Sequence, residues 1–145
     1  MDKIAIRKQL LGRFLDEVWS NGMVAACDHY IADEYTILHD PGDPWEGRLL
    51  SRDEFKERVS LSRAPFPDQR FDVQTMVGQG DAVATSWLWT ATHQGDFPGY
   101  PATGLPVLMS GATIYSFDED DLICGHWQIS DRLSVFQQLQ RNAAA

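Results

Sequence analysis

The chain has 145 residues, the usual size of one domain, so we expect a single domain over residues 1–145. Hydrophobic residues make up 43% and charged residues 23% of the chain, a globular balance that excludes a wholly disordered protein. With 12 basic and 21 acidic residues the formal net charge is −9, which disfavours nucleic acid as a partner because its phosphates are also negative.

The cysteines and the hydropathy of the sequence indicate the cellular compartment that we expect for the protein. Cys27 and Cys124 are the two cysteines, and they form no CxxC pair, so they read as free thiols in a reducing compartment. The first residues interleave charged with apolar side chains, unlike a secretory signal. No apolar run approaches the ~18 residues that a membrane span needs. We therefore expect a cytoplasmic protein with no membrane contact.

The first half of the chain predicts mainly helices. Apolar residues recur at helical spacing over residues 3–20, and Asp2 is a possible N-cap. A shorter helical segment is expected over residues 23–31, followed by a short strand over 35–39. A capping box, S-R-D-E, opens a further helix over residues 51–62.

The second half of the chain changes to an alternating pattern that predicts strands. The expected elements are strands over residues 71–77, 82–93, 107–117 and 122–130, and a closing helix over 132–141. Helices followed by long antiparallel strands indicate an α+β domain. We expect the strands to form a strongly curved sheet, a cone that the N-terminal helices close around a hydrophobic pocket.

Alternation along a strand sorts side chains onto two faces. In the strand over 82–93, one face carries Trp87, Trp89 and His93, which resembles the wall of a cavity or a bulky core. In the last strand, Trp127 and Asp131 share one face. His126 lies on the other face, and we interpret it as pointing away from the pocket, toward a subunit interface.

Asp131 is the residue with the most specific chemical prediction. A carboxylate beside indole and aliphatic groups is desolvated, which raises its pKa toward a range useful for general acid or base catalysis. The alternative is that Asp131 is the N-cap of the helix over 132–141, a common role for aspartate. The local sequence supports both interpretations equally.

Two histidines at strand ends also have two interpretations each. His93 could hydrogen-bond a substrate oxygen or pair with Asp131, or it could be satisfied by the adjoining loop. His39 has the same two possibilities. His39, His93 and Asp131 could in principle form a two-histidine, one-carboxylate metal site, but they have no diagnostic spacing, so we expect no metal.

Aromatic side chains at cavity-facing positions suggest a site for a flat, hydrophobic ligand, although they could simply be core. The expected substrate-binding set is Tyr35, Trp45, Trp87, Trp89 and Trp127.

Three groups of short stretches resemble one family. They are A-P-F-P-D at 64–68; G-D-A-V-A at 80–84 with A-T-H-Q-G-D-F-P-G at 91–99 and A-T-G at 102–104; and W-Q-I-S-D at 127–131, followed by Gln138 and Leu139. In order and spacing they resemble the SnoaL-like polyketide cyclases of the nuclear transport factor 2-like superfamily. The resemblance runs from about residue 5 to residue 140.

This resemblance implies a cone-shaped, cystatin-like α+β barrel around a hydrophobic pocket. It implies a lyase- or isomerase-like enzyme that closes a ring of an aromatic polyketide by intramolecular aldol condensation, without metal or cofactor. It assigns the acid/base role to Asp131, places His93 in the pocket, and makes His39 the histidine that commonly follows the first strand, with a lid around Trp45 and Gly47. The expected catalytic residues are therefore Asp131, His93 and His39. His126 departs from the family pattern, where an acidic or other polar residue is expected.

The resemblance does not fix the reaction, because one fold hosts many activities. Three possibilities stay open: a cyclase acting on a polycyclic keto substrate, an isomerase or dehydratase using the same carboxylate, and a small-molecule binding or dimerisation module without catalysis. The expected partners are a small hydrophobic or aromatic ligand and further copies of the chain, in a homodimer or, alternatively, a tetramer.

Overall fold

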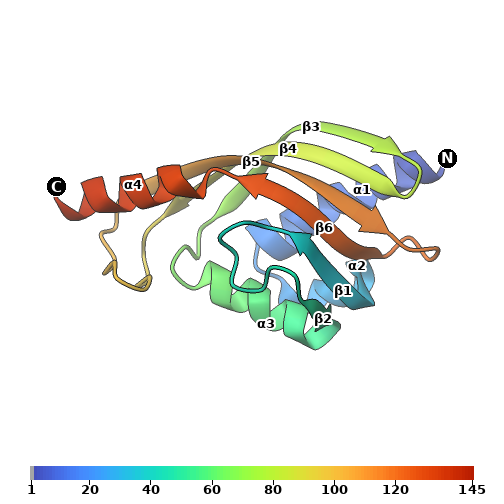
Figure 1. The fold of residues 1–145 in the computed structure, drawn as a ribbon, viewed down its shortest axis with the longest axis horizontal. Coiled ribbons are helices and arrows are strands. Elements are labelled where there is room, and N and C mark those ends of the chain that lie inside the picture. Colours follow the sequence, from blue (N-terminus) through green and yellow to red (C-terminus); the bar gives the residue numbers. More distant parts are fainter. Residues whose placement is uncertain (1) are drawn as a thin grey trace.

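The computed structural model describes residues 2–145 as helices packed on one side of a curved sheet (Figure 1). The elements in chain order are α1 (Lys3–Phe14), a π-helical turn (Leu15–Ser20), a 3-10 turn (Val24–Ala26), α2 (Cys27–Tyr30), β1 (Ile31–His39), β2 (Leu49–Ser51), α3 (Arg52–Arg63), β3 (Arg70–Gln79), β4 (Ala82–Thr92), β5 (Pro106–Phe117), β6 (Ile123–Ser130) and α4 (Arg132–Ala143).

Local capping chemistry starts the helices where the sequence predicts. The Asp2 carboxylate accepts a hydrogen bond from the Ala5 amide at the start of α1. Ser51 and Glu54 form both bonds of the capping box before α3. The helix predicted over residues 3–20 is present, but its last six residues, Leu15–Ser20, are wound as a π-helix. Such wide turns often occur near functional sites, and Trp19 from this turn reaches the cavity described below.

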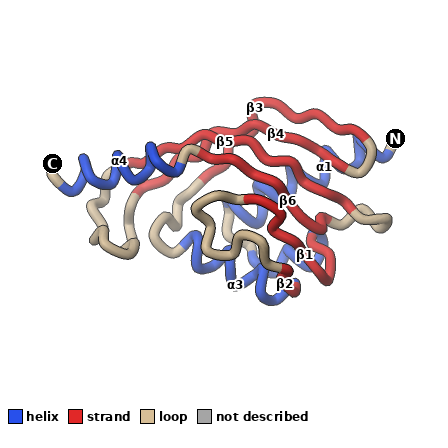
Figure 2. Tube along the Cα trace, in the orientation of Figure 1, coloured by secondary structure: helices blue, strands red, loops and turns tan. Residues whose placement is uncertain are grey.

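The six strands form one curved, unclosed sheet in the order β2-β1-β6-β5-β4-β3, which confirms the predicted α+β class (Figure 2). Strands β3 to β6 pair antiparallel, as predicted. Strand β1 pairs parallel with β6, which the sequence pattern did not predict. Strand β2 is a three-residue addition to the edge beside β1.

The hydrophobic core lies between the helices and the concave face of the sheet (Figure 1). Its largest buried side chains include Phe14, Tyr35 and Phe55. Leu139 of α4 packs with Trp87 and Trp89 in a second cluster near the other end of the sheet. The helices therefore cover one face of the sheet only, and the space that they enclose contains the site.

The convex face of the sheet remains uncovered and apolar in places. The large hydrophobic side chains exposed on this face of β3 to β6 include Val77, Leu88, Leu108, Ile114, Trp127 and Ile129. The predicted homodimer and cytoplasmic location stay predictions. Within residues 2–145, no helix combines the length and apolar character needed to cross a membrane.

Candidate active site

A cavity of about 320 Å³ opens beneath the concave face of the sheet. Its walls come from the π-helical turn, β1 and the loop after it, α3, strands β3 to β6 and α4. Ten aromatic side chains contribute to the wall: Trp19, Tyr35, Trp45, Phe66, Phe71, Trp87, Trp89, Phe97, Tyr115 and Phe136. This volume is within the usual range for small-molecule pockets, which bury flat ligands against such surfaces.

A hydrogen-bonded chain of three side chains forms one part of this wall. Asp40, wholly buried just after β1, lies 2.8 Å from Nε2 of His126 through its Oδ2. The hydroxyl of Tyr35 lies 2.5 Å from Nδ1 of the same imidazole. His126 and Tyr35 both line the cavity, while Asp40 lies behind His126. The carboxylate therefore orients an imidazole that borders the cavity.

Charged and amide groups surround Asp40 and hold it in place. Arg132 donates to its Oδ1 at 2.8 Å, and Gln128 approaches the same oxygen at 3.3 Å. Arg58 lies 3.5 Å from Asp40 and donates to Asp43 at 2.8 Å. Two arginines thus face two aspartates, and the formal charges of these four groups cancel.

The burial of this cluster sets its protonation states. Burial lowers the pKa of His126, and the hydrogen bond to Asp40 does not fully compensate. Burial raises the pKa of Asp40, but the hydrogen bond from His126 and the charge of Arg132 outweigh it, so the net pKa is lowered. Burial also raises the pKa of Tyr35 well above its ordinary value. At neutral pH, His126 is neutral, Asp40 ionised and Tyr35 protonated.

These protonation states determine which atoms donate and which accept in the hydrogen bonds between Tyr35, His126 and Asp40. A carboxylate accepts only, so Nε2 of the neutral imidazole carries the proton and donates it to Asp40. Nδ1 is then the basic nitrogen, and the Tyr35 hydroxyl donates to it. One ring nitrogen is thus held by a carboxylate, an arrangement that histidine general bases use, and the other becomes available for proton transfer once the Tyr35 hydroxyl leaves it.

A second series of side-chain hydrogen bonds connects the aromatic wall of the cavity to Asp40. The indole N–H of Trp87 donates to the Thr113 hydroxyl at 2.9 Å, and this hydroxyl donates to Oε1 of Gln128 at 2.7 Å. The Gln128 amide nitrogen then reaches Asp40. The orientation of the Trp87 ring is therefore coupled to the position of the carboxylate.

The predicted inward face of β4 is confirmed, and Trp87 and Trp89 line the cavity. Tyr35 and Trp45 also line it, whereas Trp127 does not. Substrate binding by these side chains stays a prediction.

Asp131 lies outside the cavity, at the N-terminus of α4. Its carboxylate is exposed and accepts a hydrogen bond from the Ser134 amide at 3.1 Å, so the N-cap interpretation is confirmed. The expectation that apolar neighbours desolvate Asp131 is wrong, because Trp127 and Ile129 lie on the convex face of the sheet. A catalytic role for Asp131 stays a prediction without that physical basis.

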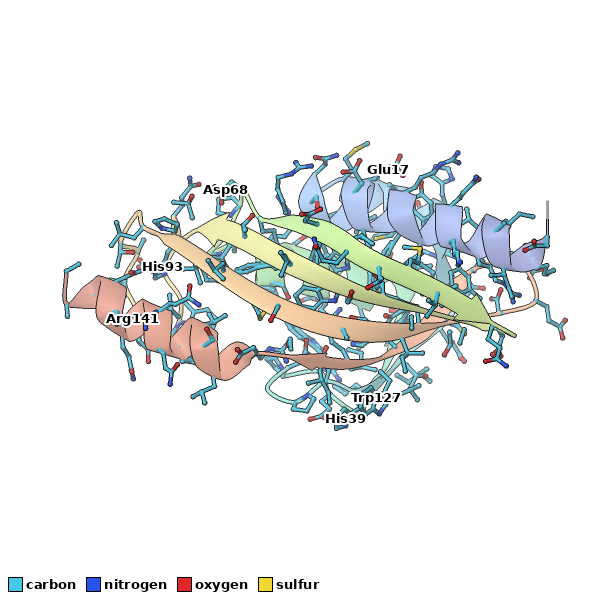
Figure 3. The ribbon with its side chains drawn as sticks, turned by 90° about the horizontal axis from the view of Figure 1, so that it is seen from above. Glu17, His39, Asp68, His93, Trp127 and Arg141 are labelled. Atoms are coloured by element: carbon cyan, nitrogen blue, oxygen red, sulfur yellow. The ribbon has the colours of Figure 1, made fainter. Side chains whose placement is uncertain are left out.

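His39 also lies outside the cavity, stacked on Trp127 with the rings 4.5 Å apart (Figure 3). A β-bulge explains this position, because Ile37 is paired with His126 and His39 with the next residue, Trp127. The extra residue in β1 changes which side chains point inward. Asp40 is buried as a result, and His39 shares the convex face with Trp127.

His93 follows β4 and is fully buried, but it is not part of the cavity wall, so the expectation that it lies in the pocket is wrong. Its ring packs on Phe66 at 5.5 Å, and neither nitrogen has a hydrogen-bond partner within residues 2–145. Figure 3 shows it near α4, far along the sheet from His39. In the described part of the chain, no three His, Cys, Asp or Glu side chains are grouped to hold a metal ion.

The interpretation that His126 points away from the pocket is wrong. In the strand register, His126 of β6 lies opposite Tyr115 of β5, and Tyr115 lies opposite the inward-pointing Val83 of β4. All three side chains are therefore on the concave face of the sheet. Asp40 was missed because it belongs to the D-P-G-D-P segment after β1, which reads as a turn. Alternation placed His126 on the face opposite Trp127, but it could not say which of the two faces is concave.

The helices packed on a curved sheet have the fold of SnoaL-like proteins. The chain belongs to the SnoaL-like polyketide cyclase family, whose pattern it matches over residues 9–139. No curated protein sequence matches the chain.

Solved structures agree with this assignment. A candidate polyketide cyclase from Acidithiobacillus ferrooxidans has 55% sequence identity and a TM-score of 0.92, with 98% of this chain and 99% of that chain covered. IdmH, a candidate polyketide cyclase from Streptomyces antibioticus, has 28% identity and a TM-score of 0.78 over 92% of this chain and 98% of its own. AclR from Streptomyces galilaeus, described as a candidate hydroxylase, shares the fold at 23% identity and a TM-score of 0.76, covering 96% and 98% of the two chains.

Proposed function

We propose that the protein is an acid/base enzyme that closes a ring of a hydrophobic, polycyclic keto substrate by intramolecular aldol condensation, using only its own side chains. One observation carries the proposal: His126, held between Asp40 and Tyr35, borders an aromatic cavity. His126 replaces Asp131 as the proposed base, because its environment keeps it neutral and it borders the cavity.

The first step removes a proton from a carbon flanked by carbonyl groups. The Tyr35 hydroxyl turns its hydrogen bond from Nδ1 of His126 to a substrate carbonyl oxygen, and the freed Nδ1 takes the carbon-bound proton. The imidazole becomes an imidazolium, which the Asp40 carboxylate stabilises through Nε2–H. Tyr35 stabilises the negative charge that develops on the enolate oxygen.

The second step forms the carbon–carbon bond. The enolate carbon attacks a second carbonyl carbon of the same molecule, whose oxygen becomes an alkoxide. The imidazolium then returns the proton to this alkoxide, which restores neutral His126. General acid/base help contributes roughly 10²–10⁴-fold to the rate, so the aromatic walls must also hold the chain in a near-attack conformer.

The experiment that tests the proposal is deuterium incorporation from D₂O into a panel of β-dicarbonyl and polycyclic keto-ester ligands. Wild type is compared with His126→Asn and with a matched control, His29→Asn, whose histidine is exposed on α2. We expect exchange to fall at least about 100-fold in His126→Asn and to be unchanged in His29→Asn.

Other outcomes separate the alternatives. Exchange that persists in His126→Asn but disappears in Asp131→Ala would restore the aspartate as the base. Exchange with double-bond migration or loss of water, and without ring closure, would indicate an isomerase or a dehydratase. Ligands that bind without exchange in wild type would identify a binding module.

A further inference from the structure

Gln69 places a buried amide in the cavity wall just before β3. The side chain belongs to a residue that is 3% exposed and lines the cavity. Its Oε1 accepts a hydrogen bond from the indole N–H of Trp89 at 2.5 Å. Its amide nitrogen has no hydrogen-bond partner within residues 2–145.

The partner of Oε1 decides which way the amide faces. An indole nitrogen only donates, so turning the Gln69 amide over would place two donors against each other. The –NH₂ group is therefore held on the side away from the Trp89 nitrogen. A buried donor left without a partner is costly in proteins, which suggests that a ligand in the cavity supplies the acceptor.

Arg58 provides a second donor of this kind. Its Nε is buried and unpartnered, and the residue lines the same cavity. The wall carboxylate of Asp43 is already occupied, by Arg58 and by the Trp45 amide. Among the described side chains of the cavity wall, the buried polar atoms without a hydrogen-bond partner are therefore Nε of Arg58 and Nε2 of Gln69. Both are N–H donors, so they fit a ligand that presents oxygen acceptors.

The two polar parts of the cavity are separated along the sheet. Val83 of β4 is in register with Tyr115 and His126, whereas Gln69 bonds to Trp89. Val83 to Trp89 spans on the order of 20 Å of strand at ~3.3 Å per residue. A substrate that reaches both must be extended, with one oxygen remote from the carbons near His126.

We infer that Gln69 is a substrate-recognition residue, which donates its Nε2–H to a carbonyl or hydroxyl oxygen at the end of the substrate remote from His126. This inference rests on the proposed function for the identity of the reacting end, and it narrows the substrate to a flat, extended keto compound with an acceptor oxygen at the Gln69 end. The bond orients the substrate and takes no part in proton transfer.

The test compares two ligands of the same shape, 9-fluorenone and fluorene, of which only the first has an acceptor oxygen. Their dissociation constants are measured for wild type, for Gln69→Met and for a matched control, Gln74→Met, whose glutamine is exposed on β3. We expect wild type and Gln74→Met to bind 9-fluorenone about twofold to tenfold more tightly than fluorene. Gln69→Met should lose that preference and bind fluorene no more weakly.

A measurement on the wild-type protein guards against misfolding of Gln69→Met, which leaves the Trp89 indole unpaired. The side-chain NH₂ signals of Gln69 are followed by ¹⁵N–¹H NMR during titration with each ligand. A downfield shift with 9-fluorenone and a smaller change with fluorene would support the inference. Equal changes, or a ketone preference that Gln69→Met retains in full, would overturn it. Neither measurement needs turnover, so a failure here is distinguishable from a failure of the His126 exchange experiment.

Discussion

Strands β4 and β6 contribute opposite kinds of side chain to the same concave face. Strand β4 points Trp87 and Trp89 inward and exposes Leu88. Strand β6 points His126 and Gln128 inward, while Trp127 is 40% exposed on the convex face. The inward direction therefore cannot be inferred from hydrophobicity alone, because the cavity needs polar groups on one strand and aromatic walls on another.

The difference follows from what each strand packs against. Inward side chains of β4 meet Phe66, Phe71 and Leu139, which favour apolar partners. Inward side chains of β6 meet Asp40 and Tyr35, which offer hydrogen bonds.

The largest stability difference should be between the tryptophans of the two strands. Trp87→Ala should lower the free energy of unfolding by about 3–5 kcal/mol, because it empties part of the core and leaves Thr113 without its donor. Trp127→Ala should cost about 1 kcal/mol, because it removes a stacked contact with His39 at the surface. Urea denaturation measures both, and equal losses would contradict the assignment of faces.

A smaller effect should follow from Gly111→Ala in β5. A Cβ atom there would overlap Cζ2 of the Trp87 ring and would lie 2.9 Å from the carbonyl oxygen of Ile129. The strand and the indole would have to separate, at a cost of about 1–3 kcal/mol. Gly12→Ala in α1, where a Cβ meets nothing within 4 Å, should instead stabilise the protein by about 0.5–1 kcal/mol. Thermal unfolding of both variants tests the contrast, and destabilisation of both would refute it.

Acid should destabilise the protein through His126. Its folded-state pKa is below the unfolded value, so below the unfolded pKa the unfolded state binds more protons and unfolding becomes easier. One such group lowers stability by up to about 1.4 kcal/mol per pH unit below about pH 6.5. Stability curves between pH 7 and pH 5 should be flatter for His126→Asn than for wild type. A slope that is unchanged in the variant would show that other groups cause the acid sensitivity.

The smallest expected effect concerns Asp131. Asp131→Ala removes the cap of α4 and should cost about 1 kcal/mol, while deuterium exchange into keto ligands continues at the wild-type rate. Asp131→Asn, which can still cap the helix, should be nearly neutral. Urea denaturation and the exchange assay together test both statements, and loss of exchange in a stably folded variant would return catalysis to Asp131.

Local sequence predicted the secondary structure well because its causes are local. The Asp2 cap, the Ser51–Glu54 capping box and the alternation along β4 each involve residues that are neighbours in the chain. The parallel pairing of β1 with β6 could not be predicted in this way, because it joins segments that are far apart in sequence.

The candidate site was predicted only in part. Tyr35, Trp45, Trp87 and Trp89 were placed at the cavity from the sequence, and they line it. Asp40 and His126 were missed, although both are near or within predicted elements. A bulge of one residue in β1 and the choice of concave face decided their positions, and neither leaves a local signal.

By itself, the sequence determined the α+β class, the caps, the alternation of each strand and the membership of a family. Only the tertiary structure decided which face of each strand is concave, and thus that His126 borders the cavity and Asp131 caps a helix. The physical reason is that side chains alternate along a strand with a period of two, which separates them into two faces without indicating which face is buried. Packing against the helices and the pairing register with neighbouring strands decide that.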